Sequence, residues 1–93
     1  MSAPHPDDVP ELAAGERVVL LGKPGCHLCE DAHGVVASVC DEKGIGWCEL
    51  DISTGHPVLW ERFWDQIPVL VVDGRVRSVY RVNPARLRSA IAG

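Results

Sequence analysis

Apolar and polar residues alternate along this chain in a way that predicts a sheet interleaved with helices. Two short apolar segments, within 17–21 and 69–72, are typical of strands buried on both faces. Residues 46–52 alternate between apolar and polar side chains, which predicts a strand parallel to the first. Between these two strands, 27–42 repeats apolar residues at helical spacing, which predicts a long helix.

The second half of the chain predicts a short helix, a hairpin and a last helix. Residues 57–64 contain the short helix, which begins at a proline. An Asp-Gly pair at 73–74 is a strong hairpin signal, so 75–80 should be an antiparallel edge strand. An Asn-Pro pair at 83–84 caps the final helix. The predicted order is β-α-β-α-β-β-α, an α/β fold in which helices flank a four-stranded mixed sheet.

The N-terminal segment differs in composition from the rest of the chain. Residues 1–16 are rich in proline, acid and alanine, which predicts a mobile tail with a short turn at 11–14, followed by one domain over 17–93. The first residues contain no basic segment followed by an apolar one, so we do not expect them to be a signal peptide. No apolar run approaches the roughly 20 residues that a membrane helix needs. We therefore expect a cytoplasmic monomer without a membrane partner, whose cysteines are mostly thiols.

Charge is distributed unevenly along the 93 residues. The net charge of −4 gives no reason to expect nucleic acid as a partner. All thirteen acidic residues lie at or before Asp73, whereas five of the nine basic residues follow it. A solvated edge strand and helix would explain this segregation. A face that attracts carboxylates of a small thiol or an acidic partner is the alternative.

The strongest chemical signal is a pair of cysteines, Cys26 and Cys29, separated by two residues. They follow the first strand and a Lys-Pro-Gly turn, so Cys26 should begin the long helix. Unpaired N–H groups and the helix dipole favour a thiolate there and predict a lowered pKa, although Glu30 and the next acid oppose the effect. Lys23 adds positive potential, as does His27 when it is protonated. Cys29 lies about one turn deeper, close enough to form a disulfide.

This layout resembles the glutaredoxin-like branch of the thioredoxin-fold proteins over about 17–91. The resemblance depends on the Cys-His-Leu-Cys motif, on the Ile67-Pro68-Val69 step before a later strand, and on the order of elements. It implies that Pro68 is cis and packs against the active cysteines, and that the backbone of Ile67 pairs with an extended substrate. From the residues alone, an ordinary trans proline remains open.

The resemblance leaves the small-molecule substrate undecided. Glutaredoxins hold glutathione with a lysine near the first cysteine, the residues before the cis-proline and a Gly-Gly…Asp signature. Lys23 and the Ile67-Pro68 step match that pattern, whereas the last signature is replaced by Tyr-Arg-Val-Asn-Pro at 80–84. The thiol is therefore glutathione, another thiol or none.

The remaining cysteines and histidines have two interpretations each. His33 is either a partly buried packing residue or, with the Cys26 and Cys29 thiols, a metal ligand. Cys40 and Cys48 should both point inward as inert thiols, and a second disulfide between them is conceivable.

We predict a dithiol thiol–disulfide oxidoreductase that needs no cofactor or metal. Cys26 and Cys29 would be its catalytic pair, and Lys23, His27, Ile67 and Pro68 would bind substrates that are disulfide-containing proteins or small thiols. The alternatives are a metal-binding module and a thioredoxin-fold adaptor whose dithiol is incidental.

Overall fold

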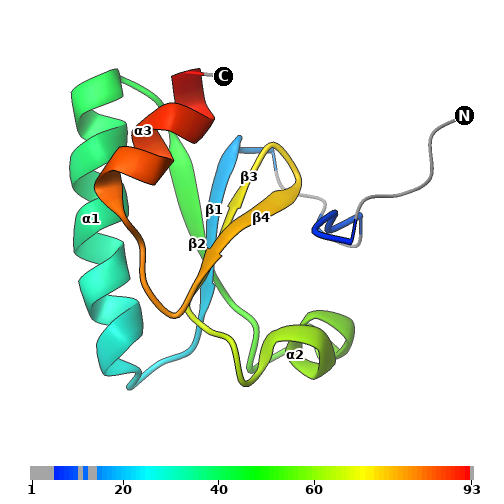
Figure 1. Ribbon diagram of the computed structural model, residues 1–93. Helices are drawn as coiled ribbons and strands as arrows, with labels where there is room; N and C mark the ends of the chain where they lie inside the picture. Colours follow the sequence, from blue (N-terminus) through cyan, green and yellow to red (C-terminus); the bar gives the residue numbers. More distant parts are fainter. Residues whose placement is uncertain (1–5, 11, 13–14, 93) are drawn as a thin grey trace, which may run out of the picture.

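The computed structural model describes residues 6–10, 12 and 15–92. Its four strands form one mixed sheet in the order β2-β1-β3-β4, with β1 in the interior and β4 at an edge, as the sequence predicted. Figure 1 shows α1 and α3 on one side of this sheet and α2 on the other. The elements are β1 (Val18–Gly22), α1 (His27–Lys43), β2 (Trp47–Asp51), α2 (Pro57–Phe63), β3 (Val69–Val72), β4 (Arg75–Val79) and α3 (Pro84–Ala92).

The central strands are buried on both faces, which explains their unbroken apolar sequence. Every residue of β1 and β3 is buried. β1 runs parallel to β2 and antiparallel to β3, and the parallel register places Gly22 beside Asp51. The last residues of β1 and β2 therefore lie at the same end of the sheet.

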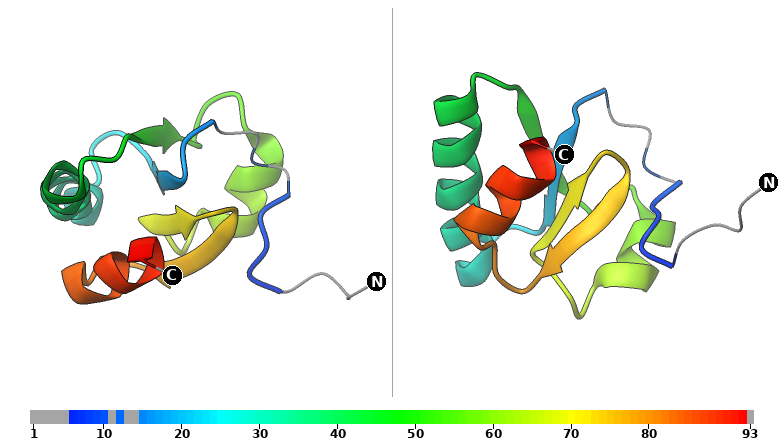
Figure 2. Two further views of the ribbon diagram at one scale, coloured as in Figure 1. Left: turned by 90° about the horizontal axis from the view of Figure 1, so that it is seen from above. Right: turned by 45° about the horizontal axis from the view of Figure 1, so that its top comes forward.

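Two apolar clusters cover the two faces of the sheet. Val18 and Leu20 pack under α1 and α3 with Val36 and Leu87, whereas Val19 and its neighbours pack on the opposite face with residues of α2. The two views in Figure 2 show the sheet between these layers. Alternate side chains of one strand thus supply both halves of the core.

The hairpin and the last helix form at the predicted positions. Asp73 and Gly74 both have positive φ angles, 53° and 77°, as a two-residue hairpin turn requires. Asn83 caps α3, because its side-chain oxygen accepts hydrogen bonds from the backbone N–H groups of Ala85 and Arg86 at 2.9 and 3.2 Å. Arg17 joins the hairpin to the last helix, because its guanidinium pairs with the Asp73 carboxylate at 2.9 Å and donates to the Ile91 carbonyl at 3.2 Å.

Residues 7 and 9 of the N-terminal segment, for which the sequence predicts a mobile tail, contact the hairpin. The Val9 N–H donates to the Gly74 carbonyl, and the Val76 N–H donates to the Asp7 carbonyl, both at 2.8 Å. Val9 is only 2% exposed, and burying such a side chain is worth roughly 1.5 kcal/mol or more. The sequence missed this contact because one valine among prolines and acids has no periodicity. The turn expected at 11–14 lies, apart from Leu12, outside the described residues.

Candidate active site

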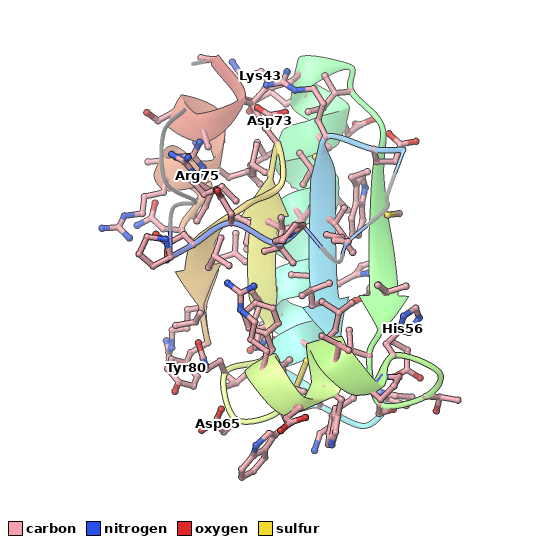
Figure 3. The ribbon with its side chains drawn as sticks, turned by 90° about the vertical axis from the view of Figure 1, so that its right-hand side faces the viewer. Lys43, His56, Asp65, Asp73, Arg75 and Tyr80 are labelled. Atoms are coloured by element: carbon pink, nitrogen blue, oxygen red, sulfur yellow. A yellow bond between two sulfur atoms is a disulfide. The ribbon has the colours of Figure 1, made fainter. Side chains whose placement is uncertain are left out.

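The end of the sheet that holds the last residues of β1 and β2 also holds the cysteine pair. In Figure 3 the arrowheads of both strands point toward the end where His56, Asp65 and Tyr80 are labelled, and Asp73 lies at the opposite end. The chain leaves β1 at Gly22, turns through Lys-Pro-Gly and enters α1 at His27. Gly25 has a φ of 72° in this turn, a conformation that glycine adopts without steric cost.

Cys26 is the N-cap of α1, as the sequence predicted. Its backbone is extended, and its Sγ accepts a hydrogen bond from the Cys29 N–H at 3.2 Å. The sulfur thereby occupies the position that a serine or aspartate oxygen takes in an ordinary N-cap. Negative charge that develops on this atom is met by the unpaired amides and the dipole of the helix.

Cys29 lies beneath Cys26 and is bonded to it. The two residues form a disulfide across a Cα–Cα distance of 5.1 Å. Cys29 is 4% exposed and belongs to the apolar cluster on the α2 side of the sheet, whereas Cys26 is only partly buried. An incoming molecule therefore reaches Cys26 before Cys29.

A pocket of about 390 Å³ opens beside the disulfide. It lies between the start of α1 and the last residues of β2, because the parallel pairing of β1 and β2 brings these segments together. The Ile52 N–H extends this pairing by donating to the Gly22 carbonyl at 3.0 Å. The residues that line the pocket are Gly22, Lys23, Pro24, Gly25, Cys26, Cys29, Glu30, His33, Glu49, Leu50 and Asp51.

Comparison with known proteins identifies the domain that carries this site. Residues 17–92 match the family model described as glutaredoxin-like domain (DUF836). The chain belongs to the glutaredoxin-like domain family. It is 36% identical over 80 residues to the uncharacterized proteins Rv0508 of Mycobacterium tuberculosis and Mb0520 of Mycobacterium bovis, and the match covers 82% of this chain and 82% of each relative.

Solved structures place the glutaredoxin-like domain in the thioredoxin-like fold, as the sequence predicted. The X-ray structure of protein XcR50 from X. campestris matches with a TM-score of 0.65 at 22% identity, covering 81% of this chain and 95% of that one. The solution structure of protein Ne2328 from Nitrosomonas europaea matches with a TM-score of 0.67 at 22% identity, covering 80% and 88%. At this level of identity, the likeness shows the fold alone.

The predicted substrate-binding residues of the glutaredoxin-like domain lie in different surroundings. Lys23 lines the pocket, whereas His27, Ile67 and Pro68 are not among its lining residues. The His27 side chain is 89% exposed, with Nδ1 at 3.9 Å from the Glu30 carboxylate. Ile67 is buried in the same apolar cluster as Cys29, and the Ile67-Pro68 bond is cis, as the resemblance implied.

His33 does not join the cysteine pair as a third metal ligand. Its Nδ1 lies 3.2 Å from the Glu49 carboxylate, and its ring meets Trp47 edge-on with a centroid distance of 5.0 Å. Within residues 6–10, 12 and 15–92, no three His, Cys, Asp or Glu side chains form a cluster that could hold a metal ion. The predicted packing role fits in part, because His33 contacts a neighbouring strand, but the residue is exposed.

Cys40 and Cys48 are free thiols, and the conceivable second disulfide is not formed. Cys40 packs in the cluster under α1 and α3, whereas Cys48 packs against the cluster on the opposite face of the sheet. Burial raises the pKa of both thiols, and for Cys48 the Glu16 carboxylate raises the pKa further. The expectation that both point inward is therefore correct, but they point into different halves of the core.

Sequence reasoning overlooked four residues of the pocket: Gly22, Glu49, Leu50 and Asp51. The signal for the last three was available, because the carboxyl ends of two parallel neighbouring strands meet at one edge of a sheet. Asp51 lies beside Gly22 in the parallel register, so it is at the same end of the sheet as the turn that leads to Cys26. Its carboxylate accepts hydrogen bonds from the Ser53 hydroxyl and N–H at 2.5 and 2.9 Å, and these bonds hold the pKa of Asp51 below its usual range.

No helix in the described residues is long and apolar enough to cross a membrane.

Proposed function

We propose that this glutaredoxin-like domain is a dithiol thiol–disulfide oxidoreductase that uses the Cys26–Cys29 couple. The observation that carries the proposal is the asymmetry of the pair at one helix start. The Cys26 sulfur is the N-cap of α1 and borders a pocket, whereas Cys29 is 4% exposed and bonded behind it. A nucleophile needs access and stabilisation of its charge, and a resolving thiol needs proximity.

The reduced protein would act in two exchange steps. The Cys26 thiolate attacks one sulfur of a substrate disulfide, the substrate S–S bond breaks, and one substrate thiolate leaves. The Cys29 thiolate then attacks the Cys26 sulfur, the mixed disulfide breaks, and the second substrate thiolate leaves. The two electrons that reduce the substrate come from the dithiol, which becomes the Cys26–Cys29 disulfide. A thiol or dithiol reductant must restore it.

The proposal extends to the residues that would hold the substrate. Lys23 borders the pocket and is exposed, so its ammonium can meet a carboxylate or carbonyl of a disulfide-containing protein or small thiol. His27, Ile67 and Pro68 would contact a longer, extended substrate that continues past the pocket. We assign such a role to the reducing environment of the cytoplasm, where a dithiol stays available.

Trapping the mixed disulfide tests the mechanism. Reduced Cys29→Ser protein, mixed with a neutral disulfide such as hydroxyethyl disulfide, should gain the mass of one substrate half at Cys26, and dithiothreitol should release it. The Cys26→Ser variant should gain no mass. Cys40→Ser in the Cys29→Ser background is the matched control and should still form the adduct. An adduct at Cys40 or Cys48 instead of Cys26 would overturn the proposal.

A further inference from the structure

The pocket beside the Cys26–Cys29 disulfide has an acidic rim. Three carboxylates, from Glu30, Glu49 and Asp51, line it together with the Cys26–Cys29 disulfide. Among the described residues that line it, Lys23 is the single side chain with a permanent positive charge. A substrate half that enters this pocket therefore meets a net negative field, which bears on the small-molecule substrate that the family resemblance leaves undecided.

Two of these carboxylates are positioned at the pocket by strand β2. Residues of a strand alternate between its faces, so Glu49 and Asp51 lie on the same side of β2. Glu49 stands opposite Leu20 and Asp51 opposite Gly22 in the parallel ladder with β1. Leu50, between them, packs against the apolar cluster on the α2 side. The two acids are thus held by the sheet toward the start of α1.

Both acids have neighbours that keep them in position. Asp51 is held by the Ser53 hydroxyl and N–H, and these bonds favour its ionised form. The Glu49 carboxylate lies 3.2 Å from His33 Nδ1, and the His33 ring in turn contacts the Trp47 ring. These are fixed charges beside the sulfur, which act on a substrate at the moment of encounter.

We propose that the acidic rim makes this domain selective for disulfides whose thiol halves carry positive charge, such as an aminothiol or a cysteine flanked by lysine or arginine. Glu49 and Asp51 are the specificity-determining residues. The inference depends on the proposed oxidoreductase function and names the substrate class for it. Glutathione, with more carboxylates than amines, is disfavoured.

The size of the effect follows from Coulomb's law in water. Each unit charge at a separation of about 7 Å changes the encounter by roughly threefold. Two rim carboxylates acting on opposite charges in two substrates should therefore separate their rates by about tenfold or more. Salt at about 1 M should remove most of that difference, because the charges are exposed.

Three small disulfides test the selectivity. Cystamine is cationic, hydroxyethyl disulfide is neutral and oxidised glutathione is anionic. The rate at which each disulfide oxidises the reduced protein is measured at about pH 8. Each rate is divided by the rate of the same disulfide with dithiothreitol, which removes differences in intrinsic reactivity. We expect the cystamine-to-glutathione ratio to exceed about ten in wild type and to fall toward one in Glu49→Gln/Asp51→Asn.

A matched control and a variant-free measurement complete the design. Asp41→Asn/Glu61→Gln removes the same charge from α1 and α2 at positions that do not line the pocket, and it should keep the wild-type ratio. Wild type in high salt should lose the ratio even if a rim variant folds poorly. A ratio near one in wild type, or a ratio unchanged in Glu49→Gln/Asp51→Asn, overturns the inference while turnover of hydroxyethyl disulfide leaves the proposed function intact. If the protein reduces none of the three disulfides, both the proposed function and the selectivity are wrong.

Discussion

Cys26 and Cys29 differ from Cys40 and Cys48 in where the backbone places them, although three of the four belong to α1 or its N-cap. The first pair shares one turn at the helix start, beside a pocket and bonded together. Cys40 lies near the other end of the same helix, and Cys48 follows on β2. The sheet separates these two, because one packs on each of its faces.

The contrast teaches that cysteine chemistry in this domain depends on helix position and burial. At the start of α1, the Cys29 N–H donates to the Cys26 sulfur, and a helix start favours negative charge at that position. At Cys40 the same helix offers only apolar neighbours, and burial raises the pKa of the thiol. In the proposed mechanism, the four cysteines therefore divide into one partly buried nucleophile, one buried resolving thiol and two packing residues.

The largest expected effect comes from removing the nucleophile. Cys26→Ser should reduce disulfide turnover by on the order of 100-fold or more, because no other described thiol combines a helix start with access. The double variant Cys40→Ser/Cys48→Ser should keep activity within about threefold of wild type, provided that it folds. Turnover of hydroxyethyl disulfide measures both. Equal losses in the two variants would erase the comparison.

Alkylation compares the thiols directly, without catalysis. In the reduced protein at pH 7, iodoacetamide should modify Cys26 at least about tenfold faster than Cys48 and Cys40, since thiolate formation and access both favour it. Peptide mass mapping over time gives each rate. Free cysteine in the same tube is the reference, and a Cys26 rate no greater than that reference would contradict the proposed activation.

The sequence was sufficient for the elements and the cysteine pair because both depend on local signals. The Asp-Gly pair at 73–74 specifies the hairpin, and the Cys-x-x-Cys spacing at a strand-to-helix turn specifies the redox pair. What it missed depends on neighbours distant in the chain. Val9 reaches the core only through pairing with the hairpin, and Asp51 reaches the pocket only through the register of β2.

The opposite faces of Cys40 and Cys48 were missed for a related reason. The sequence indicates that a helix residue and a strand residue each point to an apolar surface. It does not indicate that these are different surfaces, because both faces of the β1 strand are equally apolar. Only the crossover of α1 to one face of the sheet separates them.

A smaller effect should come from the glycine beneath the disulfide. A Cβ at Gly22 would stand 3.0 Å from the Cys29 sulfur and 3.4 Å from its Cβ, and the disulfide limits how far that sulfur can move. Gly22→Ala should therefore destabilise the oxidised protein by about 1–3 kcal/mol, measured by urea unfolding.

Gly34 is the matched control for this substitution. It lies within α1, and a Cβ there would meet nothing within 4 Å. Gly34→Ala should stabilise the protein by about 0.5–1 kcal/mol, because alanine favours the helix. If both alanine variants change stability alike, the close approach of Gly22 to Cys29 has no energetic consequence.

The smallest expected effect separates the buried thiols from the disulfide by pH. In the oxidised protein Cys40 and Cys48 remain free to titrate, and burial raises the pKa of each above that of an unfolded thiol. As pH rises through the ordinary thiol range, the unfolded chain loses these protons first. The stabilisation is complete below that range and is lost as pH rises through the folded pKa.

Between about pH 7.5 and 9.5, the free energy of unfolding should fall more in wild type than in Cys40→Ala, because the variant lacks one such proton. Comparing the two slopes cancels the contribution of every ionisable group that both proteins share. Parallel slopes would mean that Cys40 ionises as readily in the folded core as in the unfolded chain, which would contradict the effect of burial on its pKa.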